Sequence, residues 1–327
     1  MPSRIVAGIG LSHVPSVGPA YDRGKQQTPA WKPLFDAYVP VREWLAKLKP
    51  DVAIVVYNDH VADFTFDKYP TFALGAAERY PIADEGFGTR PLPEVQGDAE
   101  FSIHLCNELV QAEFDLTVCQ EMSVEHGFLV PMNLCFPHTD AGWPVRTVPL
   151  QVNVIQHPLP TARRCYRLGQ ALRDAVLSYE KNLNVVVLGT GGMSHQLQGK
   201  RFGFMNERFD RWFLDALEEN SPKLLELSHH QIMERAGAEA VELIMWLTMR
   251  GALSPRAKRV HRHYYAPMTT GMGLITFEDA RAAPARRPRP ARAPRSARAG
   301  AAAGRATAGA GRRPGAARAR ARPAKRP

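Results

Sequence analysis

Short runs of aliphatic residues recur along the first 280 positions and predict the strands of a buried sheet. The clearest runs are residues 52–57 (VAIVVY) and 185–188 (VVVL), and both lack alternating polar positions. Such continuous runs are typical of strands that are covered on both faces. Further strands are expected at residues 5–11, 71–74, 114–118, 145–155 and 273–277.

Apolar residues at three- and four-residue steps predict helices between these strands. One helix is expected from Lys32 to Lys49, a second is capped by Asp98, and a third begins near Pro160. Two more are expected near residues 206–219 and 238–250. The alternation of strands and helices predicts a single α/β domain over residues 1–280.

The charge is distributed unevenly and separates a tail from this domain. Residues 281–327 hold fourteen arginines, one lysine and no acidic residue, whereas the preceding residues carry 27 basic and all 32 acidic side chains. The tail, rich in Ala, Arg and Pro, is expected to be disordered because it has almost nothing to bury. Three interpretations remain open: an inert extension, which we favour, a nucleic-acid-binding segment, or a shifted reading frame. The arginines lack interleaved aromatic residues, so nucleic-acid binding would be non-specific and salt-sensitive.

The cysteines and the hydropathy pattern indicate in which cellular compartment the protein is located. Four cysteines lie far apart without a C-x-x-C pair, which suggests reduced and mostly buried thiols. The chain shows neither a signal-peptide pattern nor an apolar run long enough to span a membrane. We therefore expect a soluble, cytoplasmic protein.

Three histidines follow strand-like runs directly or after a tight turn: His13, His60 and His195. In an open α/β sheet such positions converge on one crevice at the carboxyl ends of the strands. A single histidine beside a strand is more often a packed or surface residue than a ligand. The repetition of the pattern makes that interpretation less satisfactory, although the chain has eleven histidines.

Glu242 gives an independent indication of a metal site. It lies in AVELIMWLTM, a segment that is apolar nearly all round and is predicted to be a buried helix. A buried carboxylate costs several kcal/mol unless a cation or strong donors compensate it. The cation could be an arginine, with Arg250 as the candidate, or a metal ion. Two imidazoles and one carboxylate form the facial triad of non-haem Fe(II) oxygenases.

Six segments carry a resemblance to a known family: LSHVP, YNDH, ADEGFG, EHGFLVP, GTGGMSHQLQG and VELIMWLTMRGAL. Together, from residue 1 to about 278, they resemble the β, catalytic subunit of protocatechuate 4,5-dioxygenase and the similar gallate dioxygenases. These are class III extradiol ring-cleaving enzymes. The resemblance implies an α/β fold around a central mixed sheet, with helices on its flanks.

The resemblance also implies the cofactor and the residues of the site. His13, His60 and Glu242 match the ligands of Fe(II), His195 matches the catalytic acid–base, and His126 matches a histidine of the substrate pocket. The implied reaction is meta cleavage of a carboxylated catechol by O₂, giving a muconate semialdehyde. Asp59, next to His60, is expected to orient an imidazole; an exposed turn aspartate is the equal alternative.

Two departures from the family concern the substrate and the partner. The segment Pro267–Gly271 reads PMTTG, closer to the gallate enzymes, whereas GTGGMSHQLQG is closer to the protocatechuate enzymes. Thr269 and Thr270 are expected to contact the distal substituent of the substrate. The resemblance implies a helical lid over the site, which is a separate small α subunit in protocatechuate enzymes and a fused C-terminal domain in gallate enzymes. The tail lacks the apolar periodicity that such a lid needs. By analogy with the protocatechuate enzymes, we expect a separate α subunit in an α₂β₂ assembly.

Protocatechuate is the first candidate substrate, and gallate, which would give an oxalo-diacid, is the alternative. A different class of function also remains, a non-catalytic binding protein on the same fold. The presence of all three ligand matches and of His195 argues against it. A third hypothesis is an RNA-binding protein that acts through its tail.

Overall fold

The central element of the computed structural model, which describes residues 2–86 and 88–279, is a mixed sheet of eight strands. A separate pair, β4 (Arg79–Tyr80) and β5 (Val95–Gln96), forms a second small sheet. The strands of the main sheet are β1 (Arg4–Leu11), β2 (Val52–Tyr57), β3 (Phe72–Gly75), β6 (Thr117–Cys119), β7 (Arg146–Val152), β8 (Asn184–Thr190), β9 (Lys258–Tyr265) and β10 (Met272–Glu278).

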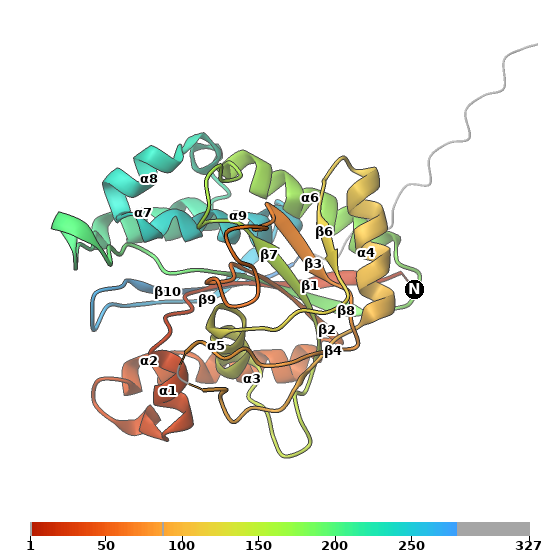
Figure 1. Cartoon of the computed structure of the whole chain (residues 1–327), viewed down its shortest axis with the longest axis horizontal. Helices are drawn as coiled ribbons and strands as arrows, with labels where there is room; N and C mark the ends of the chain where they lie inside the picture. Colours follow the sequence, from red (N-terminus) through yellow and green to blue (C-terminus); the bar gives the residue numbers. More distant parts are fainter. Residues whose placement is uncertain (1, 87, 280–327) are drawn as a thin grey trace, which may run out of the picture. The chain divides into compact units, whose positions relative to one another are not determined.

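Helices cover both faces of this sheet (Figure 1). The α-helices are α1 (Val17–Asp22), α2 (Lys32–Ala37), α3 (Val39–Leu48), α4 (Ala99–Gln111), α5 (His126–Cys135), α6 (Ala162–Ser178), α7 (Glu207–Glu218), α8 (His229–Ala236) and α9 (Leu243–Ala252). Short 3₁₀ segments are η1 (Lys25–Gln27), η2 (Gly199–Arg201), η3 (Pro222–Glu226) and η4 (Glu239–Glu242). The predicted fold class, an α/β domain with a central mixed sheet, is confirmed.

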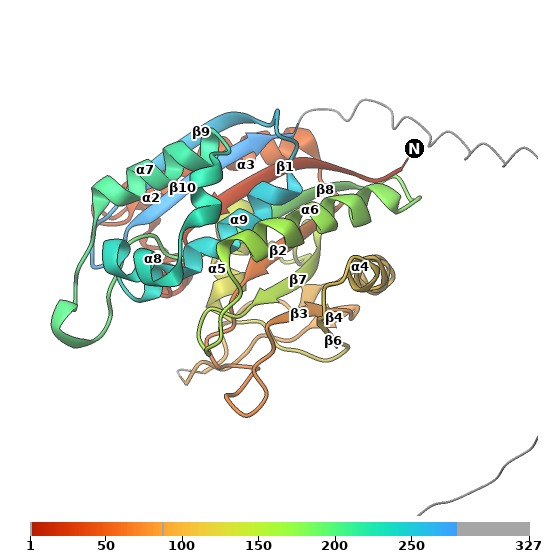
Figure 2. The same ribbon diagram turned by 90° about the horizontal axis from the view of Figure 1, so that it is seen from above.

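The strand order determines where the functional residues lie. It is β6-β3-β7-β2-β8-β1-β10-β9, and the four neighbours β7, β2, β8 and β1 run parallel. Figure 2 shows β9 and β10 toward one edge and β3 and β6 toward the other. Because parallel strands end at the same side of a sheet, the segments after β1, β2 and β8 meet there.

Each face of the sheet has its own hydrophobic core. In β2, Val52, Ile54 and Val56 pack into the core formed with α4, α6, α7 and α9. The alternate residues, among them Val55 and Tyr57, pack into the core formed with α1, α2, α3 and α5. This two-sided burial explains the continuous apolar run of residues 52–57, since successive side chains of a strand point to opposite faces.

The predicted helix at residues 32–49 is wrong as a single element. The structure divides it into α2 and α3, with Tyr38 between them and Pro40 in the first turn of α3. Proline has no N–H to donate to the preceding turn, so it starts a helix more readily than it continues one. The strand predicted at residues 114–118 is shifted as well and covers Thr117–Cys119.

The predictions for the helix cap and the cysteines are confirmed, whereas those for the tail are not tested. Asp98 caps α4 by accepting the N–H of Phe101, as expected. The four cysteines are buried free thiols, also as expected. Within the described ranges, no helix combines the length and the apolar character needed to cross a bilayer. The domain boundary at residue 280 and the basic tail lie outside the described residues.

Candidate active site

Three predicted ligand residues converge at the carboxyl edge of the sheet. His13 follows β1, His60 follows β2, and Glu242 ends η4 directly before α9. The Nε2 atom of His13 is 3.3 Å from Oε2 of Glu242, and that of His60 is 3.6 Å from Oε1. One donor atom from each residue lies within 4.8 Å of the other two. This spacing brings two imidazoles and a carboxylate into one candidate ligand group.

Both imidazoles are held from behind through their Nδ1 atoms. Nδ1 of His60 is 3.1 Å from Oε2 of Glu125, and Nδ1 of His13 is 3.0 Å from Oγ1 of Thr190. An ionised carboxylate only accepts, so Nδ1 of His60 donates to Glu125, while its Nε2 lies 3.1 Å from the side-chain amide nitrogen of Asn58 and faces Glu242. The buried Nε2 of His13 has no hydrogen-bond partner among the described residues.

Glu242 is 7% exposed, and its Oε2 accepts the N–H of Gly192 at 2.5 Å. Burial would raise its pKa, but His13 and His60 hold the pKa well below the ordinary value. Gly191 allows this close approach, because a Cβ there would lie 2.7 Å from Cβ of Glu242. Its φ of 130° is also one that other residues rarely adopt.

Arg250 is not the cation that compensates Glu242. Its guanidinium donates to the carbonyl oxygens of Leu217 and Ser254 instead. The sequence predicted Glu242 inside one helix over residues 238–250, whereas the structure places it at the junction of η4 and α9. The chemistry of the site fits a divalent metal ion, because two imidazole nitrogens and a carboxylate are its common ligands.

Glu125 is a site residue that the sequence analysis missed. It is 0% exposed, and its Oε2 lies 2.6 Å from Nδ1 of His126 as well as 3.1 Å from Nδ1 of His60. Its Oε1 accepts the N–H of Gly127 at 2.8 Å and caps α5. Burial would raise its pKa, but the charges of His126 and His60 lower the pKa far below the ordinary value. The sequence did contain a signal for this residue, because Glu125 directly precedes a mostly apolar segment, which forms the fully buried helix α5.

His195 lies beside the ligand group without belonging to it. It is 6% exposed, and its Nδ1 is 2.8 Å from the carbonyl oxygen of Met193. A carbonyl oxygen can only accept, so Nδ1 carries the proton of the neutral ring and Nε2 carries the lone pair. An imidazole in this tautomer can take up a proton at Nε2.

A cavity of about 380 Å³ joins these groups. The residues that line it are His13, Val14, Pro15, Ser16, His60, His126, Gly192, His195, Leu197, Glu239, Glu242, Met268, Thr269 and Thr270. Neither Lys nor Arg contributes to this lining in the described part of the chain. Its size suits a small aromatic molecule, and its acidic residues favour a bound cation.

The predicted substrate-binding residues all line this cavity. The ring of His126 stacks on that of His60 at 4.1 Å between centroids, and its buried Nε2 has no partner among the described residues. Thr270 pairs with His195 in an isolated antiparallel bridge, and Thr269 precedes it. The structure thus brings these residues together, and their contacts with a substrate remain a prediction.

Asp59 does not make the expected contact with an imidazole. It is fully buried, and its carboxylate accepts the N–H groups of Ala62, Asp63 and Phe64. The alternative of an exposed turn aspartate is therefore excluded as well. Asp59 fixes the loop that follows His60, and the contact expected of it is made by Glu125.

The family assignment follows from a direct comparison. A family model described as the catalytic LigB subunit of aromatic ring-opening dioxygenase matches residues 7–275. The chain belongs to this family. The site residues described above, from His13 to Thr270, all lie inside the matched region.

Several curated proteins of known name are similar to this chain. A gallate dioxygenase of Pseudomonas putida is 45% identical over 205 residues, which cover 62% of this chain and 60% of that protein. A 2,3-dihydroxyphenylpropionate/2,3-dihydroxicinnamic acid 1,2-dioxygenase of Pseudomonas putida is 28% identical and covers 79% of this chain and 93% of its own length. The match thus spans less than two thirds of the gallate dioxygenase.

A solved structure supports the fold alone. The crystal structure of an uncharacterized protein from Escherichia coli K12 has a TM-score of 0.52 and 16% sequence identity. It covers 83% of this chain and 99% of its own chain.

Proposed function

We propose that this chain catalyses extradiol cleavage of a carboxylated catechol by O₂, with Fe(II) bound by His13, His60 and Glu242. The observation that carries the proposal is the convergence of these three ligand types on a cavity that also contains His195. Membership of the LigB family supports the reaction class. The two imidazoles and one carboxylate form the ligand set of non-haem Fe(II) oxygenases.

Fe(II) at this site supplies open coordination positions and the redox chemistry that lets O₂ react with an aromatic ring. The protein supplies orientation and proton transfer. Nε2 of His195 accepts a proton from a catechol hydroxyl and returns it during ring opening, while the Met193 carbonyl retains Nδ1–H. Both oxygen atoms enter the product as the ring carbon–carbon bond beside the diol breaks, so no external reductant is needed.

The substrate is proposed to be a dihydroxybenzoate or a trihydroxybenzoate. His126, Thr269 and Thr270 line the cavity and offer an imidazole and two hydroxyls to the ring substituents. Protocatechuate is the first candidate on sequence grounds. Gallate is the second candidate, and the 45% identity to a gallate dioxygenase supports it.

A substrate panel tests the proposal. The full chain is reconstituted with Fe(II) under anaerobic conditions and mixed with O₂ and protocatechuate, gallate or 2,3-dihydroxyphenylpropionate, with and without the α partner. We expect O₂ uptake with a carboxylated catechol, and the ultraviolet–visible spectrum separates a semialdehyde from an oxalo-diacid. Binding of these acids without O₂ uptake under any condition would instead indicate a non-catalytic binding protein.

We also propose a separate small α subunit that covers the cavity in an α₂β₂ assembly. Leu197 and Met268 line the cavity and are 47% and 41% exposed, so apolar surface is available at its rim. A lid would exclude water from the reaction. A cytoplasmic location is proposed as well, in keeping with four free thiols.

The variant Glu125→Gln should weaken metal binding about 10-fold to 100-fold, the usual effect of losing a partner that orients a ligand. An amide cannot accept from Gly127 on one side and from two imidazoles on the other, because one of its two polar atoms is a donor. Titration of the metal-free chain with Fe(II) measures the change. The exposed neighbour Glu121 provides the matched control, Glu121→Gln. Equal affinities in the two variants would show that Glu125 does not support the metal site.

A further inference from the structure

A buried carboxylate lies behind the turn that carries His195. Asp210, in the first turn of α7, is 0% exposed. Its Oδ1 accepts the N–H of Ser194 at 2.8 Å, and its Oδ2 accepts the hydroxyls of Ser194 at 2.6 Å and Tyr264 at 2.8 Å. Among the described residues it forms no ion pair. Burial raises its pKa, so its placement costs free energy that three neutral donors offset only in part.

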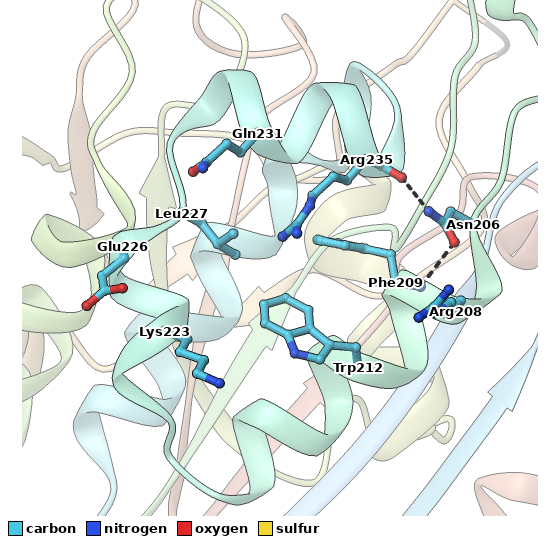
Figure 3. Close-up of a pocket in the computed structure, with 9 residues that line it drawn as sticks. All are labelled: Asn206, Arg208, Phe209, Trp212, Lys223, Glu226, Leu227, Gln231 and Arg235. Atoms are coloured by element: carbon cyan, nitrogen blue, oxygen red, sulfur yellow. Dashed lines mark hydrogen bonds between the residues drawn. The ribbon is translucent and has the colours of Figure 1, made fainter.

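Ser194 connects this carboxylate to the surrounding elements. Its hydroxyl accepts the N–H of Asn206, and its carbonyl accepts the N–H of Gly271. Asn206 in turn caps α7 through Phe209 and donates to the carbonyl of Arg235, as the dashed lines of Figure 3 show. The residue directly before His195 is therefore tied to α7, α8 and the strand pair β9–β10.

The segment after β9 completes the enclosure of the turn. Met193 donates its N–H to the carbonyl of Gly271, and His195 pairs with Thr270. A Cβ at Gly271 would lie 2.4 Å from Oδ2 of Asp210, so only glycine leaves room for the carboxylate. Asp210 thus occupies the point where α7, the turn after β8 and this segment meet.

We propose that Asp210 is a positioning residue for His195. Through both the N–H and the hydroxyl of Ser194, it fixes the turn that holds Met193 and His195 in place. The Nδ1–H of His195 then stays on the Met193 carbonyl, and its Nε2 lone pair is presented to the cavity. The inference rests on the proposed function, in which His195 transfers the protons. A displacement of about 1 Å at such a group lowers a rate about 100-fold.

Two variants test the proposal through kinetics. Asp210→Asn keeps the shape but replaces one acceptor oxygen by a donor, and Ser194→Ala removes the hydroxyl held by Oδ2. Each should lower kcat about 10-fold to 100-fold while KM and bound Fe(II) stay near the wild-type values. The control Asp215→Asn also breaks a contact between α7 and β9, the ion pair of Asp215 with Arg262, but it does not touch Ser194. It should leave kcat unchanged.

A spectroscopic measurement gives a readout that does not depend on turnover. In the full chain loaded with diamagnetic Zn(II) and labelled with ¹⁵N-histidine, the Nδ1–H of His195 should give a slowly exchanging signal, assigned by its loss in His195→Ala. This signal should exchange fast in Asp210→Asn and Ser194→Ala and stay slow in Asp215→Asn. If the wild type cleaves no catechol but the signal follows this pattern, the proposed function fails and the positioning role stands. Slow exchange and wild-type kcat in either test variant would overturn the positioning role.

Discussion

A Glu242→Ala variant should lose bound iron down to background and show no measurable ring cleavage. Glu242 is the carboxylate of the candidate ligand group, and the Nε2 atoms of His13 and His60 face it at 3.3 and 3.6 Å. Two imidazoles alone do not make the three-ligand set that such a metal requires. Metal analysis after Fe(II) reconstitution and an oxygen electrode measure the two losses.

The variant should still fold. The substitution removes one hydrogen bond, which Gly192 donates, and this loss destabilises the fold. It also removes a buried charge, and the free energy saved by no longer desolvating that charge offsets part of the loss. Glu234→Ala, on the exposed face of α8, is the matched control and should keep its iron. If Glu242→Ala bound iron as tightly as this control, the ligand assignment would be refuted.

His195→Ala should keep its iron and lose about 10²-fold to 10⁴-fold in turnover, the range typical of a general acid–base. The side chain lines the same cavity as the ligands but does not belong to their group. Alanine therefore removes proton transfer and leaves the metal donors in place. Steady-state O₂ uptake together with metal analysis separates the two effects.

His104→Ala provides the control for this experiment. The imidazole of His104 also lies within hydrogen-bonding distance of a backbone carbonyl, that of Ala175. His104 belongs to α4, however, and does not line the cavity. That variant should retain full turnover. Unchanged turnover in His195→Ala would remove the acid–base role from the proposed mechanism.

The sequence predicted the part of the site that depends on local patterns. The apolar runs of β2 and β8 were recognisable, and parallel strands must end at one side of the sheet. The convergence of His13, His60 and His195 was therefore predictable from the chain alone. The isolated carboxylate of Glu242 was recognisable because the residues around it are apolar.

The contacts between distant segments were not predictable in this way. Glu125 meets His60 only because α5 begins beside the end of β2; the apolar residues after Glu125 indicate a buried carboxylate but not which histidine it contacts. Asp210 reaches Ser194 and Tyr264 through the packing of three separate elements. The strand β9 was missed as well, since Lys258, Arg259 and Arg262 give it the composition of an exposed segment.

The position of β1 in the sheet has a consequence for how the chain matures. Its two neighbours are β8 and β10, so that Ala7 pairs with Val186 on one side and with Glu278 on the other. During synthesis the first strand has no partner until β8 has been made, and its second partner, β10, is the last strand of the domain. Such a pairing between distant positions is intrinsically slow to form. The ligand group joins His13, near the start of the domain, to Glu242, near its end, so a nascent chain shorter than 242 residues cannot hold the complete metal site.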